Sequence, residues 1–251
     1  MLSFRRKSGF LTITHKYYCD EIDSRDMFRL AVYYQARLSG RCFGFISRPF
    51  YTVVNALDRT EQEMLGNFTS TVRNEVRRSE RENVRFELMN DVEVFRQFHN
   101  EFASAKRTYL ADKGLLDGYK DKLFITCAKL GDRVLAAHAY LCDSETETVR
   151  LLFSSNARLT QQIDANFIGR ANKYLHFKDM IHFRDSGYRL YDFGGFAYNT
   201  SDRERQGINA FKRSFGGELV RLTDYQSWLY WSSSRLFYGF ASLLRKVVPA
   251  N

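Results

Sequence analysis

The sequence predicts an α/β (α+β) fold with a mixed, mostly antiparallel central sheet and helices on both faces. Residues 122–154 read as three successive strands joined by short turns, which is the pattern of an antiparallel meander. Helical and strand periodicities alternate before and after this meander, which indicates crossover connections. No GxGxxG or Walker sequence follows a predicted strand, so the pattern disfavours a doubly wound nucleotide-binding fold.

The first elements are strand-like runs at residues 10–14 and 50–57, separated by a mixed stretch around 27–36. Thr60 and Glu63 form a capping-box pattern that predicts a helix from residue 60 to about 82. A strand with period-two alternation follows at 84–88. Asn90 with Glu93 then predicts the start of a second helix, whose buried face consists mainly of aromatic residues up to Tyr109.

After the meander, a polar loop leads into a long predicted helix at 163–186, which Gly187 ends. A strand at 188–192 ends in Phe-Gly-Gly, and Ser201 with Glu204 predicts the start of one more helix. Gly216 and Gly217 end that helix before a last strand at 219–222. The sequence thus divides into a divergent N-terminal part (1–57), a core (58–226) and a C-terminal helix (227–251).

The amino-acid composition limits the classes of function that the protein can have. The 251 residues include 38 Lys and Arg against 29 Asp and Glu, a formal charge of +9 that favours polyanions and phosphate-bearing cofactors as partners. Four cysteines and five histidines show no CxxC or HxxxH spacing, so neither a metal nor a disulfide framework is expected. No run reaches the roughly 20 apolar residues of a spanning helix. These features predict a cytoplasmic protein.

Three motifs in the C-terminal half carry the strongest signal: Asn-Lys-Tyr-Leu-His at 172–176, Gly-Tyr-Arg-Leu-Tyr-Asp-Phe-Gly-Gly at 187–195, and Phe-Lys-Arg-Ser-Phe-Gly-Gly at 211–217. In this order they resemble the Fem-like branch of the GNAT superfamily of acyltransferases, which includes peptidoglycan aminoacyltransferases and single-domain enzymes of polysaccharide assembly. An arginine-rich helix and strand at 65–86 extends the resemblance to about residues 50–225. The resemblance implies a GNAT-like fold and direct acyl transfer to an amine.

Lys212 and Asp192 are the candidate catalytic residues. A fixed cation at Lys212 would stabilise the negative charge that develops on a carbonyl oxygen, and backbone N–H groups around 136–139 would assist it. A solvated helix lysine is the alternative interpretation. Asp192 ends a strand, where its carboxylate could orient or deprotonate an acceptor ammonium, or simply bind the following turn.

Further residues are candidates for donor or acceptor binding. They comprise two arginines of one helix face, two serines where the donor loop begins, two glycines that permit a close approach, a phenylalanine beside Lys212, and three polar residues that could equally be packed core: Arg73, Arg77, Ser154, Ser155, Gly194, Gly195, Phe211, Asn172, His176 and His138.

The resemblance implies an N-acyltransferase that uses acyl-CoA or an acyl carrier protein and acts on an amine of a bacterial cell-envelope sugar or peptide precursor, in soluble or lipid-linked form. An aminoacyl-tRNA donor and a non-catalytic binding protein of an envelope-polysaccharide pathway remain alternatives. Residues 228–248 form an amphipathic, basic stripe that could contact the inner face of the membrane, the protein's own core, or a second subunit in a homo-oligomer.

Overall fold

The computed structural model describes residues 2–8, 11–160 and 162–235. The chain divides into two compact units, one made of Met1–Phe50 with the residues from Arg221 onward, the other of Tyr51–Val220. Strands β4 (Phe45–Ala56) and β10 (Glu218–Ser227) contribute residues to both. This division differs from the expected segments 1–57, 58–226 and 227–251, because the residues after 220 group with the first fifty.

The first unit is built on strands β1 (Leu2–Ser8), β2 (Leu11–Tyr17) and β3 (Ala31–Ala36), with the short 3-10 helix η1 (Ser24–Phe28) between the last two. The strand order is β1-β2-β3-β10, with a parallel pair β2–β3 between antiparallel neighbours. One cluster of buried apolar residues in this unit consists of Cys19, Ala31, Tyr33, Ala36, Phe45 and Tyr225. The sequence did not predict β1 or delimit β3.

The second unit has the strand order β4-β9-β8-β7-β6-β5. Its remaining strands are β5 (Arg85–Leu88), β6 (Leu123–Leu130), β7 (Arg133–Asp143), β8 (Thr148–Asn156) and β9 (Leu190–Gly195). Only the pair β8–β9 is parallel among the pairs with a described register in this unit. The predicted mixed, mostly antiparallel sheet and its central meander are therefore confirmed.

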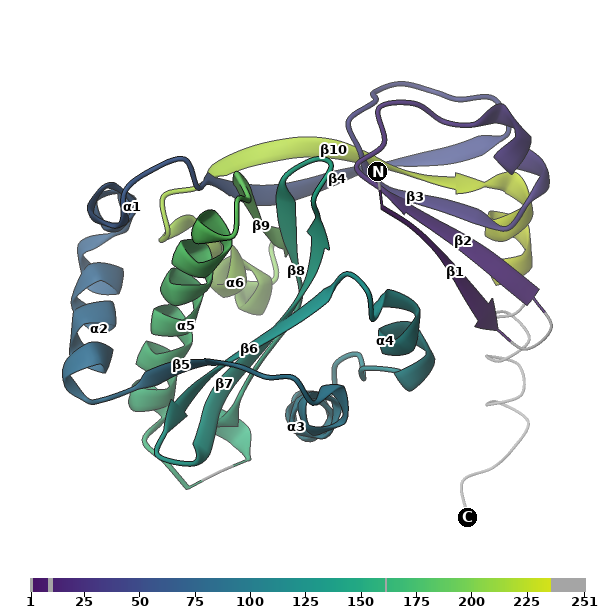
Figure 1. The fold of residues 1–251 in the computed structure, drawn as a ribbon. Helices are drawn as coiled ribbons and strands as arrows, with labels where there is room; N and C mark the ends of the chain where they lie inside the picture. Colours follow the sequence, from purple (N-terminus) through teal and green to yellow (C-terminus); the bar gives the residue numbers. More distant parts are fainter. Residues whose placement is uncertain (1, 9–10, 161, 236–251) are drawn as a thin grey trace, which may run out of the picture. The chain divides into compact units, whose positions relative to one another are not determined.

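Helices cover both faces of this sheet (Figure 1). The long helix α5 (Ala165–Asp185) packs on β6 and β7 together with α2 (Ser70–Arg81), whereas α3 (Val92–Lys106) lies against β7 and β8 from the other side. The remaining helices are α1 (Glu61–Asn67), α4 (Lys113–Tyr119) and α6 (Arg203–Arg213). Residues 136–140 alternate between the two faces, so His138 points toward α5 while Ala137 and Ala139 face α3.

The helix predicted at 60–82 is two helices. The Thr60–Glu63 capping box is confirmed, but the chain is extended at Phe68, which ends α1. Phe68 is buried there against Phe177 and Phe215, so core packing outweighs helix propensity. Two expected helix starts are also wrong by one residue, since Asp91 and Asp202 are the N-caps.

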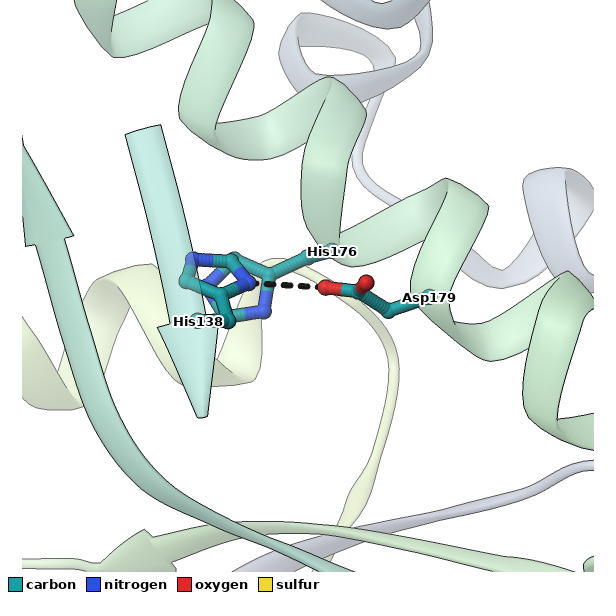
Figure 2. A group of neighbouring side chains, drawn as sticks. All are labelled: His138, His176 and Asp179. Carbon is teal, nitrogen blue, oxygen red and sulfur yellow. Dashed lines mark hydrogen bonds and ion pairs between the residues drawn. The ribbon is translucent and has the colours of Figure 1, made fainter. Parts of the chain in front are cut away.

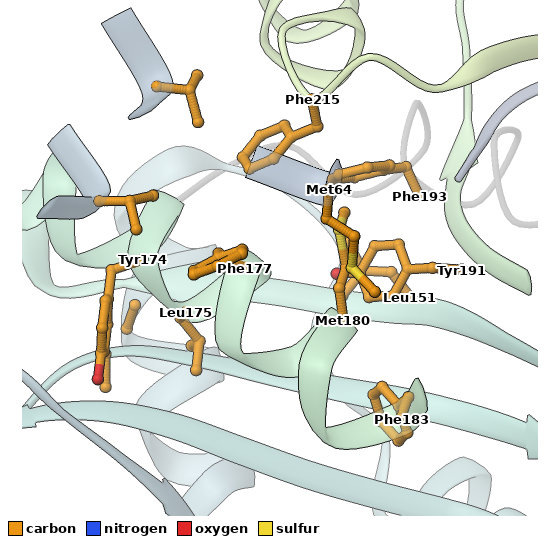
Figure 3. Packing of buried hydrophobic residues seen from close by; sticks show 14 of the residues in the cluster. Met64, Leu151, Tyr174, Leu175, Phe177, Met180, Phe183, Tyr191, Phe193 and Phe215 are labelled. Carbon is orange, nitrogen blue, oxygen red and sulfur yellow. The ribbon is translucent and has the colours of Figure 1, made fainter. Parts of the chain in front are cut away.

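Among its described residues, the second unit has two clusters of buried apolar residues, a larger one between the sheet and α1, α2 and α5 (Figure 3) and a smaller one beneath α3 and α4. Phe193 of β9 and Phe215, just after α6, lie 5.1 Å apart between ring centroids, which fixes α6 against the end of β9. Residues 228–235 are helical, but most of the expected stripe at 228–248 lies outside the described residues. In the part of the chain that the structure describes, no helix is long and apolar enough to span a membrane.

Candidate active site

The two parallel strands of the second unit separate partway along their length. β8 and β9 are paired at only three positions, from Thr148 with Leu190 to Arg150 with Asp192. Both strands continue beyond this point, to Asn156 and Gly195. Backbone groups of β8 that face β9 beyond Arg150 therefore have no partner in a β8–β9 ladder, whereas on β9 the Gly194 N–H and the Gly194 and Gly195 carbonyls are bound by side chains.

A cleft of about 970 Å³ opens at this separation. Its walls are the parted segments Arg150–Ser154 and Phe193–Gly195, the first half of α5, helix α6, and the segment that follows α3. The volume is at the upper end of the range usual for small-molecule and cofactor sites.

Basic side chains dominate the lining. Seven line the cleft against two acidic ones: Lys106, Arg107, Arg150, Arg158, Lys173, Arg205 and Lys212, against Asp202 and Glu204. Some are compensated, since Lys106 lies 3.0 Å from Glu204 and Lys173 pairs with Glu75. A positive excess remains, which favours a ligand that carries phosphate.

Lys212 projects from α6 to the end of β9. Its ammonium donates hydrogen bonds to the carbonyl oxygens of Gly194 (2.9 Å) and Gly195 (2.5 Å). Gly194 has φ +68°, and a Cβ there would lie 3.0 Å from the Leu151 carbonyl oxygen, so the turn requires glycine. Burial lowers the pKa of Lys212 to about 8, although the nearby Asp192 carboxylate raises it and Arg150 lowers it further.

Asp192 does not line the cleft. Its side chain is buried and accepts hydrogen bonds from the Thr52 hydroxyl and from the backbone N–H of Gly194 at 2.7 Å. The carboxylate thus shapes the glycine turn and acts electrostatically on Lys212. The structure does not place it where it could take a proton from a ligand in the cleft directly.

A buried hydrogen-bond network lies behind the cleft. His176, which lines the cleft, contacts the Tyr191 hydroxyl through Nδ1 at 2.7 Å, and Tyr191 contacts the Tyr140 hydroxyl at 2.7 Å. Tyr140 donates a hydrogen bond of 2.5 Å to the Asp179 carboxylate. The same carboxylate lies 2.7 Å from Nδ1 of His138 (Figure 2). The network therefore connects the cleft to a buried histidine–carboxylate pair.

The network returns to the cleft through Asn172, whose Oδ1 lies 3.1 Å from Nε2 of His138. Burial, together with His138 and Lys212, holds the pKa of His176 well below its ordinary value, so this ring is uncharged at neutral pH. Burial also raises the pKa of Tyr140 and Tyr191 well above the ordinary value, so both keep their protons.

Three members of this cluster, His138, His176 and Asp179, are close enough together to hold a metal ion. However, the two nitrogens of His138 already face Asn172 and Asp179, and Nδ1 of His176 faces Tyr191. Since these atoms have hydrogen-bond partners, we interpret the cluster as a proton-bearing network.

The structure brings most predicted site residues to this cleft. Seven line it: Lys212, Ser154, Asn172, His176, Gly194, Gly195 and Phe211. Ser155 is buried beneath it, 2.6 Å from Nδ1 of His99. His138 lies behind it. Arg73 and Arg77 are elsewhere, and Arg73 donates to the carbonyl oxygens of Gly66 and Phe68 at the end of α1.

The expectation that backbone N–H groups around residues 136–139 assist the oxyanion is wrong. Strand β7, which contains residues 136–139, pairs with β6 on one side and β8 on the other, so its backbone groups are used within the sheet. The available backbone lies on β8 instead. The sequence also did not indicate Arg150, Arg158 or the segment Lys106–Tyr109, because only the tertiary fold brings the end of α3 to the parted strands.

No family model and no curated protein matches the sequence. Several solved structures match the fold of this chain. FemX gives a TM-score of 0.65 at 12% identity, with 93% of this chain and 85% of that chain covered. The chain has a Fem-like fold.

L-PGS from Bacillus licheniformis shares this Fem-like fold, with a TM-score of 0.58, 12% identity, and 89% of this chain and 80% of that chain covered. The C-terminal domain of a protein described as a lysylphosphatidylglycerol synthetase from Agrobacterium fabrum gives 0.55 at 13% identity, covering 90% and 80%. At these identities the comparisons establish the Fem-like fold alone.

Proposed function

We propose that the protein is an N-acyltransferase that moves an acyl group from a thioester donor, acyl-CoA or an acyl carrier protein, to an amine of a cell-envelope sugar or peptide precursor. The observation that carries the proposal is the cleft between the parted strands β8 and β9, with Lys212 at its edge. The Fem-like fold supports an acyl transfer. The envelope acceptor rests on the sequence motifs and on a fold neighbour named for a lysylated phospholipid.

The donor fits the cleft by shape and charge. Exposed strand edges of β8 can hydrogen-bond an extended amide-containing chain such as pantetheine, as an added strand would. The basic lining, which includes Arg150 and Arg158, suits the phosphates of CoA or of a carrier protein's prosthetic group.

The transfer itself requires stabilisation of one developing charge. The acceptor nitrogen attacks the thioester carbonyl, a C–N bond forms, and the C–S bond breaks to release a thiolate. Two Lys212 protons are held by the carbonyls of Gly194 and Gly195, which leaves the third for the oxyanion. Free backbone N–H groups of β8 would assist. No covalent enzyme intermediate is needed in this scheme.

His176 is the group that takes the acceptor proton. It is uncharged at neutral pH, and its Nδ1 is hydrogen-bonded to Tyr191 while the ring lines the cleft. When Nε2 gains a proton, Nδ1 passes its own to Tyr191, which passes one to Tyr140, which protonates Asp179. The reverse sequence returns the proton to the thiolate. Asp192 has a positioning role, since it fixes the turn at Gly194.

An aminoacyl-tRNA donor is the second candidate. The basic lining favours it equally, and the lysylphosphatidylglycerol synthetase among the fold neighbours is named for attachment of an amino acid. The chemistry would be the same, with an ester in place of the thioester. The donors differ in one measurable respect, because RNA binding depends steeply on salt whereas a fitted small molecule is less sensitive.

The testing experiment measures thermal stabilisation of the full chain by acetyl-CoA, palmitoyl-CoA and bulk tRNA, each at low and moderate salt. An acyl-CoA that stabilises the protein at both salt concentrations is then supplied with a panel of amino sugars and peptides, and thiol release is recorded. Stabilisation by tRNA alone, lost on adding salt, would favour the aminoacyl reaction. Absence of stabilisation and of thiol release with every donor would refute both.

A further inference from the structure

A second cavity lies within the first unit and shares no lining residue with the cleft. Its volume is about 340 Å³, and arginine accounts for four of its ten lining residues: Arg37, Arg41, Arg48 and Arg221, with Leu38, Ser39, Gly40, Ser47, Pro49 and Thr223. All ten belong to the same compact unit. No acidic residue is among them, so the cavity is strongly positive.

The arginines converge because their strands are neighbours. Arg37 follows the last residue of β3, Arg221 lies on β10, and Arg48 lies on β4. The register that pairs Ala36 with Thr223 brings the end of β3 beside β10. Arg41 comes from the loop between β3 and β4. The cluster is therefore a consequence of sheet topology, not of adjacency in the sequence.

The loop at residues 37–44 is held in place on several sides. The buried Tyr225 hydroxyl donates to the carbonyl oxygens of Gly40 (2.9 Å) and Leu38 (3.4 Å). The Arg37 N–H donates to Cys19, and at the other end Trp228 N–H donates to the Gly44 carbonyl. A site that is fixed before its ligand arrives binds with a smaller entropic cost.

The arginines are poorly compensated. Arg37 lies 3.9 Å from Asp20, with both side chains well exposed, and such a pair contributes little. Among the described residues, Arg41, Arg48 and Arg221 have no ion pair with a carboxylate. The positive charge around the cavity is therefore largely unneutralised by carboxylates of the described residues, which favours a bound anion.

We propose that this arginine pocket binds a phosphate group, carried by a soluble phosphorylated compound or by the headgroup of an anionic phospholipid. Guanidinium forks hydrogen-bond phosphate oxygens in pairs, and the hydroxyls of Ser39, Ser47 and Thr223 add donors. The cavity volume lies at the lower end of the range usual for ligand sites, so it can hold a phosphate together with part of the group that carries it. The proposal stands independently of the acyl-transfer proposal, since it concerns other residues in another unit.

The test compares the full wild-type chain with the double variant Arg41→Ala/Arg48→Ala and with the control Arg85→Ala/Arg133→Ala. The control removes the same charge from exposed arginines outside the pocket. Binding of inorganic phosphate is titrated at constant ionic strength. We expect the pocket variant to bind at least about tenfold more weakly, and the control to match the wild type.

Phenylglyoxal modification mapped by mass spectrometry locates the bound phosphate, since phosphate should protect Arg41 and Arg48 in the wild type. Sedimentation with vesicles of phosphatidylglycerol or of phosphatidylcholine then separates the two sources. Retention on phosphatidylglycerol alone, lost in the pocket variant, identifies a lipid headgroup; phosphate binding without vesicle binding identifies a soluble compound. Equal phosphate affinity in all three proteins, without protection of either arginine, would overturn the proposal.

Discussion

Lys212 is the side chain on which the proposed transfer depends most directly. Because its pKa is lowered to about 8, the ammonium is charged at neutral pH and loses its charge as pH rises through 8. Wild-type activity should therefore decline above about pH 8. Lys212→Met should reduce kcat by roughly 10²–10³-fold, the usual cost of removing one donor to an oxyanion. The measurement is thiol release from the donor between pH 6 and 9.5.

Lys212→Arg is the matched variant, since arginine stays charged across this range. Its residual activity should lack the decline above pH 8, and an unchanged decline would assign that titration to another group. Stability gives a second readout. Between pH 8 and the ordinary value of 10.5, the unfolded chain binds more protons at this lysine than the folded chain. Wild type should therefore gain stability relative to Lys212→Met as pH rises through that interval.

His176 carries the second prediction. His176→Gln should lower kcat by about 10²–10⁴-fold with little change in KM, because a general base acts in the transition state. Tyr191→Phe removes only a hydroxyl of the network and should cause a smaller loss. His182→Gln is the control, since His182 lies on the same helix but packs against Phe124 and Phe86, away from the cleft.

Hydroxylamine as acceptor separates a chemical role of His176 from a structural one. This amine is already uncharged at neutral pH, so it should restore much of the activity that His176→Gln loses with an ordinary amine. A variant equally impaired with both acceptors would indicate a packing role. A variant as active as the wild type would exclude His176 as the base while leaving the acyl transfer itself intact.

Sequence motifs predicted some of these site residues but not the contacts that they make. Lys212, His176, Asn172 and Gly194 belong to recognisable motifs, and all four line the cleft. Asp192 belongs to a motif as well, but the motif does not reveal that its carboxylate turns inward to Thr52. The hydrogen-bond network of His176 could not be predicted, because Tyr191 of β9 and Tyr140 of β7 meet helix α5 only in the folded chain.

The break between α1 and α2 assigns a structural role to Arg73. This arginine, predicted as a ligand contact, donates instead to the carbonyl oxygens of Gly66 and Phe68, which the end of α1 leaves without helical partners. Arg73→Ala should lower the free energy of unfolding by about 1 kcal/mol, with donor binding unchanged. Arg77→Ala should change it by less than about 0.5 kcal/mol. Chemical denaturation with and without donor measures both.

Elements with strong local signals were predicted well, and those shaped by tertiary contacts were not. The meander β6–β8 and helix α5 carry clear periodicity and end signals, and both were predicted within a few residues. The interruption at Phe68 was missed because the helical pattern of apolar residues runs through it; burial against Phe215 decides the conformation. In β1 the alternation of apolar and polar residues covers only Leu2 to Arg5 before a run of charged residues, which is too short to predict a strand.

The two units carry two separate positive sites. In the second unit, the basic lining surrounds parted strands and a desolvated lysine, which suits chemistry on a phosphate-bearing donor. In the first, four arginines surround a small cavity without a buried acid, base or nucleophile among the lining residues, which suits binding alone. The two groups of basic residues thus suit different chemistry.

If the two sites bind different ligands, each ligand should slow amide hydrogen exchange in a different set of residues. A bound acyl-CoA should slow amide exchange in β8, whose edge lacks a β9 partner beyond Arg150, and in β9 and the start of α6, which line the same cleft. Inorganic phosphate should instead slow exchange at residues 37–48 and 221–223, which line the arginine pocket. Exchange in β5 and β6 should respond to neither ligand and provides the internal control. If acyl-CoA protected the arginine pocket and left β8 and β9 unchanged, the donor would be bound by the first unit, and the assignment of the cleft as the donor site would be wrong.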